Sequence, residues 1–506
     1  MSWTLTPVFL DPSGPLATSN PPATLSEAES ARWNNIVRTF VTPAIAPNVR
    51  GVSAQSMNAA QRYIRLEPLV AQHPDWPLAV TLLAETHYLM NDSHGALQLL
   101  RQVQQTITHG TDPSFDTAVG QLQLLVDEDS GEEEDYESEL KVKVYKRPAL
   151  LAQVPLSTSL LNVDESLALW SSLKTAKTAE VAIDQFARNA AIQTNVLEGV
   201  FSIDGDSWPL LVKRGLFENS ICGISQTSRI KKPKKIVEIL RTTDACFSDL
   251  TAVLQDSHRY NDQFVQTIHG KLLKNDNISY EYDEEVGQYA LLIPRGTYRR
   301  VPCFTTHEAK GLETRFCPWK ALADETKWYF DAARKVLADS DINPFLAAAW
   351  LQFAFLRIHP FADGNGRVSR IISSIPLLRA NLPPVVVAAV RKGEYFDALD
   401  HADRTGDCAV LAYFLKKEID FAIAEIASLA ADVTVSLAAL IAGGDPRSKS
   451  TAKKPTLKRP ATSEKDVHFY FGLTELAAID SRSGTAIARV NGTGVERCIA
   501  VNFATR

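Results

Sequence analysis

The sequence predicts a mainly α-helical protein, and three observations support this fold class. Apolar residues recur at helical spacing over 76–90 and again over 93–107. A longer region with helical periodicity runs from about 163 to 440. Its one clear interruption, 280–306, alternates apolar and polar residues, which predicts short strands or a hairpin. The chain of 506 residues is long enough for about three domains.

Composition and charge indicate an ordinary folded protein. Hydrophobic residues make up 45% of the chain and charged residues 22%, values that exclude a largely disordered protein. The 53 basic and 59 acidic side chains give a net charge of −6, so we expect no nucleic-acid partner bound by bulk electrostatics. The six cysteines show no Cys-x-x-Cys spacing, which predicts neither a disulfide framework nor a zinc site and favours a reducing compartment.

Two further features bear on location. Residues 1–22 lack the basic start and the apolar centre of a signal peptide. The apolar stretch 421–440 contains Glu425 and Asp432 and has helical spacing, so it predicts a buried helix face and no membrane span. We therefore expect a soluble, cytoplasmic protein, with the nucleus as the alternative through the basic stretch Lys453–Arg459.

The N-terminal part is predicted to consist of three segments. Residues 1–55 are rich in Pro, Ser, Thr and Asn and are expected to be irregular. Residues 56–126 are predicted to be helical, and the pair at 76–90 and 93–107 resembles one tetratricopeptide unit, with an ordinary helical hairpin as the alternative. Residues 127–150 join an acidic block to several basic residues. This segment predicts a solvated charged linker, with a partner-binding tail as the alternative.

The C-terminal part is also predicted to have three segments. Residues 151–440 are expected to form one mainly helical domain. Residues 441–466 are predicted to be a basic linker, for which a nuclear-import signal is the alternative. Residues 467–506 end in a predicted β-hairpin over 486–503, around Asn491-Gly492-Thr493-Gly494.

One segment, HPFADGNGRVSR from His359 to Arg370, carries most of the chemistry. Apolar helical patterns flank it at 345–358 and 368–378, so it is predicted to be a loop between two buried helices. Its two glycines allow backbone N–H groups to turn inward at the positive end of the second helix. Such a nest binds anions, and a di- or triphosphate is the natural ligand.

The polar residues of this segment suit nucleotide chemistry. Arg367 and Arg370 offer two guanidinium groups that match phosphate oxygens. Asp363 supplies a hard carboxylate of the kind that holds Mg²⁺ together with substrate phosphates. His359 titrates near neutrality and can accept a proton from an attacking hydroxyl. Each feature alone is common in structural roles, but their combination predicts nucleotide-dependent transfer onto a hydroxyl.

The same segment resembles the HxFx(D/E)GNGRxxR signature of the Fic (Fido) family at every constrained position. The resemblance covers roughly residues 160–430, since Ile268-His269 matches relatives and Gly296-x-Tyr298-Arg299 with Val301–Thr306 is similar to the family's target-aligning flap. It implies a Fic-type helical bundle with a short β-hairpin flap, preceded by a tetratricopeptide-like hairpin as in certain animal Fic enzymes. The implied activity is protein adenylylation, the transfer of AMP from ATP to a Ser, Thr or Tyr hydroxyl of a target protein.

The resemblance also implies roles for the residues of the loop. His359 would be the catalytic base, and Asp363 the ligand of Mg²⁺. Arg367 would act on the β-phosphate side and Arg370 on the γ-phosphate, so ATP and Mg²⁺ are the expected cofactors. The remaining phosphate-loop contacts would be made by Gly364, Asn365 and Gly366.

A second motif, Thr194-Asn195-Val196-Leu197-Glu198-Gly199, resembles the inhibitory (S/T)xxxE(G/N) helix of the family. In relatives its glutamate binds the second arginine of the signature and displaces the γ-phosphate of ATP. Carried over, Glu198 would pair with Arg370 and restrain the enzyme, while an ordinary helix glutamate is the alternative.

Two departures from the family pattern bear on specificity. Pro302, in the predicted flap, removes a backbone donor, so a target segment could pair with that edge only in part. Asp403 stands where many relatives carry Asn near the adenine. The sequence therefore predicts phosphate binding more directly than a preference for adenine.

Two other functions stay open at this point. If Glu198 orients a water against a phosphodiester, the same site would be a deAMPylase that removes AMP from a modified protein. If the core is inactive, the chain would be a scaffold protein that acts through its helical repeat. A homodimer is also left open.

Overall fold

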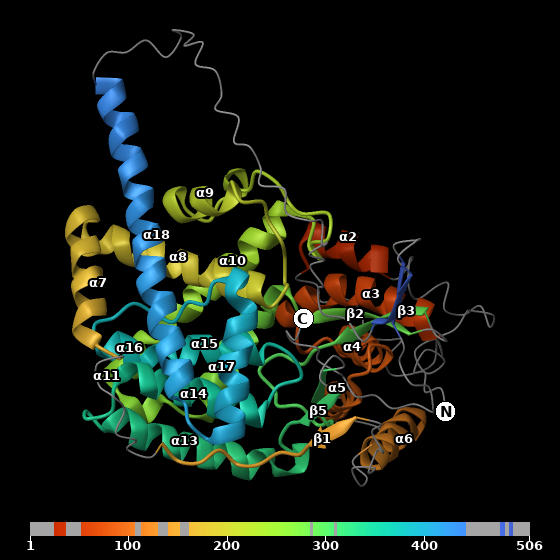
Figure 1. The fold of residues 1–506 in the computed structure, drawn as a ribbon. Helices are drawn as coiled ribbons and strands as arrows, with labels where there is room; N and C mark the ends of the chain where they lie inside the picture. Colours follow the sequence, from red (N-terminus) through yellow and green to blue (C-terminus); the bar gives the residue numbers. More distant parts are fainter. Residues whose placement is uncertain are drawn as a thin grey trace.

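The computed structural model describes residues 25–36, 52–106, 113–129, 140–151, 161–283, 287–307, 311–441, 476–480 and 485–488. Over these residues the protein is mainly helical with a few short strands, which confirms the predicted fold class. The helices gather in two bodies, a smaller one from the N-terminal part and a larger one that contains the motif loop (Figure 1).

The smaller body, here called the N-terminal helical unit, has its own apolar core. Trp33, Trp76 and Leu100 are buried in it, and the two indole rings lie 4.4 Å apart. The two helices predicted at 76–90 and 93–107 are present and pack against each other, while the tetratricopeptide resemblance stays a prediction. The unit consists of α2 (Glu27–Ile36), α3 (Val52–Gln72), α4 (Pro77–Leu89), α5 (Ser93–Thr106) and α6 (Pro113–Asp129).

Helix α2 lies inside the segment 1–55, which was expected to be irregular, so that expectation is wrong for this stretch. Its start is a capping box: the Ser26 N–H donates to Glu29 Oε2 at 2.8 Å, and the Glu29 N–H donates to Ser26 Oγ at 3.3 Å. The helix then buries Trp33 and Ile36 against the rest of the unit. Tertiary packing therefore stabilises a short helix whose own sequence pattern is weak.

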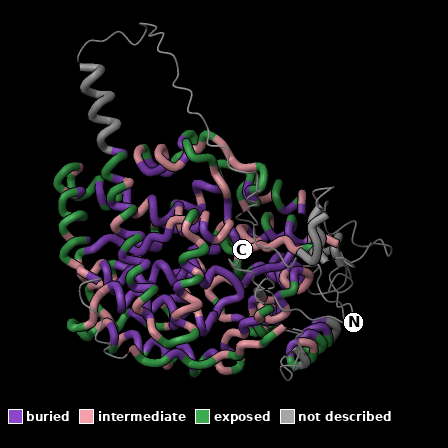
Figure 2. The backbone as a smooth tube through the Cα atoms, viewed as in Figure 1, coloured by how far each residue is buried: buried purple, intermediate pink, exposed green. Residues whose placement is uncertain are grey.

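The larger body is a helical bundle around α14, whose residues are almost all buried. In Figure 2 the interior of this body is mostly coloured as buried. Its sequence PFLAAAWLQFAFLRI is apolar all round, as expected for a central helix. The bundle consists of α7 (Val163–Lys177), α8 (Ala179–Leu197), α9 (Ser207–Arg214), α10 (Pro233–Asp249), α11 (Thr251–Gln255), α12 (Asp262–Leu272), α13 (Leu322–Ala338), α14 (Pro344–Ile358), α15 (Asn365–Ile372), α16 (Ser374–Arg379), α17 (Lys392–Thr405) and α18 (Ala409–Ile441).

The strands around the predicted hairpin form two separate sheets. Strands β2 (Ile278–Asp283) and β3 (Gly287–Leu292) make an antiparallel hairpin that packs on the N-terminal helical unit. Strands β4 (Phe304–His307) and β5 (Leu312–Arg315) pair antiparallel, and the predicted flap, 296–306, consists of the segment before β4 and the first residues of β4. Strand β1 (Lys141–Lys143) adds to β5 in parallel, so this sheet has the order β1-β5-β4. The prediction of short strands or a hairpin over 280–306 is confirmed, and the strands of this segment belong to two different sheets.

The segment 140–150 is also attached to the bundle, whereas a solvated linker was expected. Lys143 forms an ion pair with Asp403, and Arg147 binds Glu325 through Nη2 at 2.6 Å. The Trp350 indole N–H donates to the Ala149 carbonyl at 2.9 Å. The basic residues have partners far along the chain, which local charge patterning cannot reveal.

The C-terminal part of the described chain begins with the long helix α18, which runs beyond the bundle (Figure 1). The predicted buried face is confirmed at Ile423, Ile426 and Leu429, and the burial of residues 430–441 is outside the description. Further on, β6 (Leu476–Asp480) pairs with β7 (Thr485–Ala488), upstream of the predicted turn at Asn491–Gly494. That turn and the basic linker Lys453–Arg459 lie outside the described residues. In the described part of the chain, no helix is both long enough and apolar enough to span a membrane.

Candidate active site

The motif segment forms a loop between two buried helices, as its flanking patterns predicted. Helix α14 ends at Ile358, and His359 adopts a left-handed conformation with φ 53° and ψ 58°. Helix α15 begins at Asn365, and Gly364 precedes it with φ 78°. Both turns need backbone conformations that L-residues adopt at a cost, and the glycine meets this need at the second turn.

The His359 ring is buried and its orientation is fixed. Its Nδ1 donates to the Leu356 carbonyl at 3.2 Å, and the ring stacks on Phe316 with centroids 3.9 Å apart. Burial, together with the nearby Arg299 and Arg357, lowers the pKa of His359 to about 3. The ring is therefore neutral at physiological pH with its lone pair on Nε2, the form that a general base requires.

Arg299 holds the left-handed turn in place from the side of the flap. Its Nε donates to the His359 carbonyl at 2.7 Å, and its backbone N–H donates to the Pro360 carbonyl at 2.9 Å. Its Nη1 donates to the Val301 carbonyl at 2.8 Å. The flap and the end of α14 are thus joined by one buried guanidinium. Sequence reasoning placed Arg299 in the flap but did not assign it this role.

Asp363 is buried beside two charged neighbours. Arg367 Nη2 lies 3.6 Å from its Oδ1, and the Gly364 N–H also donates to that oxygen. Burial raises the pKa of Asp363 to about 6, with the carboxylate of Asp276 adding to the rise. A divalent cation would stabilise the charged form of this carboxylate, so the residue fits its expected role. The described residues contain no group of three or more His, Cys, Asp or Glu side chains around it, so nucleotide oxygens and waters would complete the coordination.

His269 connects the flap to the motif loop. Its Nε2–H donates to the Asp363 carbonyl at 2.9 Å, and its Nδ1 accepts from the Gly296 N–H at 2.9 Å. The ring stacks on Phe361 with centroids 3.7 Å apart, and burial lowers the pKa of His269 to about 3. His269 is therefore neutral at physiological pH, and its role is to position the loop and not to transfer a proton. Sequence reasoning noted only a family resemblance at Ile268-His269 and assigned no role to this histidine.

The side chain of Asn365 is used within the loop. Its Oδ1 accepts from the Phe361 N–H at 3.0 Å, and its Nδ2 donates to the Phe361 carbonyl at 2.8 Å. Both polar groups of the amide are thus engaged in closing the turn. A phosphate contact by Asn365 stays a prediction, and its backbone N–H in the first turn of α15 is the group that supports it.

Glu198 lies at the end of α8, with its carboxylate in the anion nest of the loop. Its Oε1 accepts from Arg370 Nη2, and Arg370 Nε donates to Thr194 Oγ1 at 2.7 Å. A Cβ atom added to Gly366 would lie only 2.1 Å from Glu198 Oε1. The carboxylate therefore rests directly over Gly366 in the first turn of α15, where a helix N-terminus favours an anion.

Asp403, which was expected near the adenine, is neutralised by protein cations. Its Oδ1 lies 2.9 Å from Arg357 Nε, and Lys143 pairs with its other oxygen. A carboxylate held by two cations is suited to anchor β1 and the end of α14. An adenine contact at this position stays a prediction.

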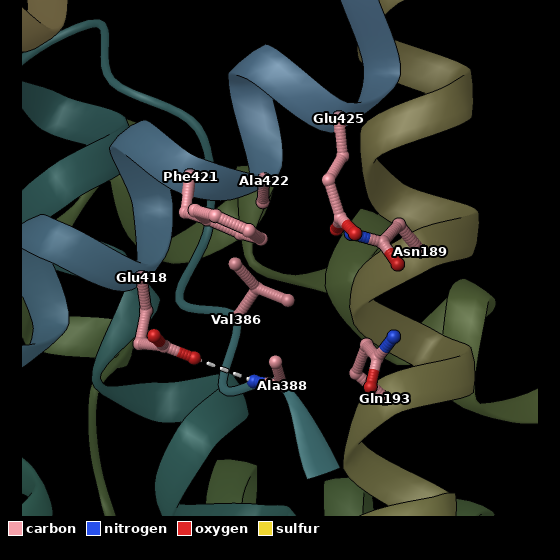
Figure 3. Close-up of a pocket in the computed structure, with 8 residues that line it drawn as sticks. All are labelled: Asn189, Gln193, Val386, Ala388, Glu418, Phe421, Ala422 and Glu425. Atoms are coloured by element: carbon pink, nitrogen blue, oxygen red, sulfur yellow. Dashed lines mark hydrogen bonds between the residues drawn. The ribbon is translucent and has the colours of Figure 1, made fainter. Parts of the chain in front are cut away.

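A small hollow lies between α8, α18 and the segment before α17 (Figure 3). Its cavity volume is about 10 Å³, room for about one water molecule, so it is too small for a nucleotide. It contains none of the motif residues. Its walls are formed by Asn189, Gln193, Val386, Ala388, Glu418, Phe421, Ala422 and Glu425.

Residues 260–377 match the model of the Fic/DOC family, and the match includes the whole motif loop. The protein adenylyltransferase Fic of Aedes aegypti is 29% identical over 126 residues, which are 24% of this chain and 25% of that relative. A Fido domain-containing protein of Dictyostelium discoideum is 44% identical over 62 residues, 12% of this chain and 43% of the relative. The chain thus spans less than half the length of these curated relatives.

A solved structure of Fic-1 from Caenorhabditis elegans aligns over 81% of this chain and 98% of that chain, with 15% identity and a TM-score of 0.37.

Proposed function

We propose that this protein is an adenylyltransferase that transfers AMP from ATP to a Ser, Thr or Tyr hydroxyl of a target protein, and that Glu198 restrains it. One observation carries the proposal: the anion nest at the start of α15 already holds a carboxylate of the chain's own, bound to Arg370. A site that attracts this carboxylate also suits the phosphates of ATP.

The transfer step uses residues that face one loop. His359 Nε2 accepts the proton of the target hydroxyl, whose oxygen attacks the α-phosphorus of ATP while the bond to the bridging oxygen breaks and pyrophosphate leaves. Arg367 and Arg370 stabilise charge on the departing phosphates. Asp363 would hold Mg²⁺, which neutralises charge on the pyrophosphate group when bound.

Glu198 would restrain the enzyme because its carboxylate and a phosphate group of ATP compete for the same place beside Gly366. Glu198 binds Arg370 and lies against Gly366, and a phosphate group of ATP would need the same arginine and the same place. A nucleotide phosphate that enters the nest therefore has to displace a buried carboxylate, whose ion pair with Arg370 is almost excluded from water. Removing the Glu198 carboxylate by mutation should therefore leave this place free for a phosphate group. In the wild type, a target protein would have to move α8, which carries Glu198 at its end, to free the same place.

The proposal is tested by incubating the purified protein with α-labelled ATP and Mg²⁺ and measuring label on the protein itself and on a cell lysate. The wild type should give little label, Glu198→Gly should give at least tenfold more, and Glu198→Gly/His359→Ala should give none. Glu198→Gln, which keeps the shape and loses the charge, should fall between the wild type and Glu198→Gly.

The same experiment separates the alternatives. No label with Glu198→Gly would contradict the proposal. If the wild type then releases AMP from pre-labelled protein and Glu198→Gly does not, the site is a deAMPylase. If neither variant binds ATP in a thermal-shift assay, the scaffold role is favoured.

A further inference from the structure

We infer that Asp276 is a positioning residue for Arg367 and that the N-terminal helical unit holds Asp276 in place. The inference rests on the proposed function, because it concerns how Arg367 is presented to a nucleotide. Asp276 directly follows the short 3₁₀ helix Leu273–Asn275, far from the motif loop in sequence.

Asp276 is buried between two arginines. Its Oδ2 accepts from Arg367 Nη1 at 3.2 Å, and both its oxygens accept from Arg229 Nη2, at 2.7 and 2.8 Å. Only 5% of Asp276 and 1% of Arg367 is exposed. In so dry a place a charged hydrogen bond fixes the direction of a guanidinium much more firmly than it would at the surface.

Arg367 lies between two carboxylates with different tasks. Its Nη1 contacts Asp276 and its Nη2 faces Asp363, the expected metal ligand. Its Nε is buried and has no hydrogen-bond partner among the described residues, so it is available to a ligand. Asp276 thus keeps part of the guanidinium away from Asp363. Without Asp276, Arg367 would be left with Asp363 as its carboxylate partner and would compete with the metal.

The position of Asp276 is fixed in turn by the N-terminal helical unit. The next residue, Asn277, donates through Nδ2 to the hydroxyl of Tyr63 in α3 at 2.9 Å. Its carbonyl accepts from the Ile293 N–H at 2.9 Å, which closes the β2–β3 hairpin on the same surface. At the same open end of this hairpin, just after β3, Arg295 forms an ion pair with Glu67 of the same helix. Helix α3 therefore contacts the chain at Asn277, the residue next to Asp276.

A purely structural ion pair is the competing explanation, because a buried aspartate between arginines stabilises any fold. The two explanations differ in what they predict for ligand binding. A structural pair affects the melting temperature alone, whereas a positioning residue also changes the affinity for nucleotide and the demand for metal.

The test uses the full chain with Glu198→Gly as the background and measures ATP affinity by thermal shift in EDTA, then the Mg²⁺ concentration that gives half of the further stabilisation. Adding Asp276→Ala should weaken ATP binding about tenfold, the effect of losing a buried charged hydrogen bond, and raise the Mg²⁺ midpoint. Asp276→Asn should weaken binding less. Tyr63→Phe, in the other body, should weaken it about threefold.

Glu85→Gln is the matched control, because it breaks another buried ion pair, with Arg62 at 2.9 Å, inside the N-terminal helical unit. It should lower the melting temperature and leave ATP affinity and the Mg²⁺ midpoint unchanged. If Asp276→Ala does not fold, Asp276→Asn decides the question.

Unchanged ATP affinity and Mg²⁺ midpoint in the Asp276 variants would overturn the inference while the proposed function stands, and so would an equal loss in Glu85→Gln. A selective loss in the Asp276 variants, together with no transfer of label by Glu198→Gly, would support the inference and contradict the proposed function. Absence of ATP binding by every variant would overturn both.

Discussion

Three titratable side chains of the motif loop and its support are shifted toward their neutral forms by burial. The pKa values of His359 and His269 are lowered to about 3, and the pKa of Asp363 is raised to about 6. At neutral pH the site therefore combines two uncharged imidazoles with one carboxylate beside Arg367. The histidines lose protons far below the working pH, so the carboxylate is the group of these three that can titrate near it.

The first prediction concerns the acid side of the activity profile. In the Glu198→Gly background, transfer should fall as the pH drops through about 6, because protonated Asp363 cannot hold Mg²⁺. Protons and metal compete for this carboxylate, so a tenfold increase in Mg²⁺ should move the acid limb to lower pH. The measurement is the initial rate of labelling from pH 5 to 8 at two Mg²⁺ concentrations. If the acid limb of the profile does not move with the Mg²⁺ concentration, the titration of a group other than Asp363 causes it.

The second prediction concerns Gly366, which leaves room for the Glu198 carboxylate. Gly366→Ala should lower the free energy of unfolding by about 3 kcal/mol, because its Cβ pushes the carboxylate away from Arg370 and breaks a buried ion pair. In the Glu198→Gly background the same substitution should cost less than about 1 kcal/mol. Urea unfolding of the four proteins measures this coupling. Additive costs would show that the two residues do not meet in solution.

Nucleotide binding separates the two variants further. Glu198→Gly should bind ATP, whereas Glu198→Gly/Gly366→Ala should not regain full affinity, because the added methyl group fills the place that a phosphate needs.

At the scale of secondary structure elements, the end of α14 depends on one guanidinium from the flap. Arg299 donates to the His359 carbonyl in the turn that carries the base and to the Val301 carbonyl in its own segment. A planar group with several fixed donors can serve these acceptors together, while the single ammonium of a lysine cannot. The geometry of the base therefore depends on an element 60 residues away in sequence.

The third prediction follows from this contact. Arg299→Lys should lower the free energy of unfolding by about 2–3 kcal/mol, because buried carbonyls lose their donors, and should reduce labelling in the Glu198→Gly background. Arg334→Lys is the matched control, since Arg334 donates to one carbonyl, that of Tyr260, at 3.2 Å and lies nearer the surface. It should change neither property much. Equal effects of the two substitutions on unfolding and labelling would contradict the prediction that Arg299 holds the turn at His359.

Sequence reasoning reached the motif loop because its signals are local. Glycines, flanking apolar helices and polar residues within twelve positions predicted the nest and the roles of its side chains. Glu198 was reached by a second local motif, and the structure places its carboxylate beside Arg370.

The supporting residues could not be found in this way, because their partners are distant. His269 and Asp276 contact residues 94 and 91 positions away, and a single sequence carries no sign of such pairs. The same reason explains the wrong expectation for 140–150, whose charges are paired with Glu325 and Asp403 and are not all left to solvent. A run of charges looks the same in either case.

At the scale of the whole molecule, the β2–β3 hairpin connects the N-terminal helical unit with the helical bundle that contains the motif loop. Ala290 and Leu292 are buried in the core of the N-terminal helical unit, and the Leu292 N–H donates to the Met90 carbonyl at 2.9 Å. Yet the hairpin begins just after Asp276, which contacts Arg367, and ends near Gly296, which contacts His269. The hairpin should therefore unfold together with the N-terminal helical unit. The residues just before and just after the hairpin contact residues of the site.

The fourth prediction tests which core the hairpin shares, using two cavities of equal size. Leu100 and Leu351 are both fully buried, one in the N-terminal helical unit and the other in α14. Each change to alanine should cost about 2–5 kcal/mol. By hydrogen exchange, Leu100→Ala should speed exchange in α3, α4, α5 and the β2–β3 hairpin, but not in α14. Leu351→Ala should do the reverse. If the hairpin exchanges with α14 instead, its strands are stabilised from the bundle, and a disturbance of the helical unit would reach Asp276 through side-chain contacts such as that between Asn277 and Tyr63.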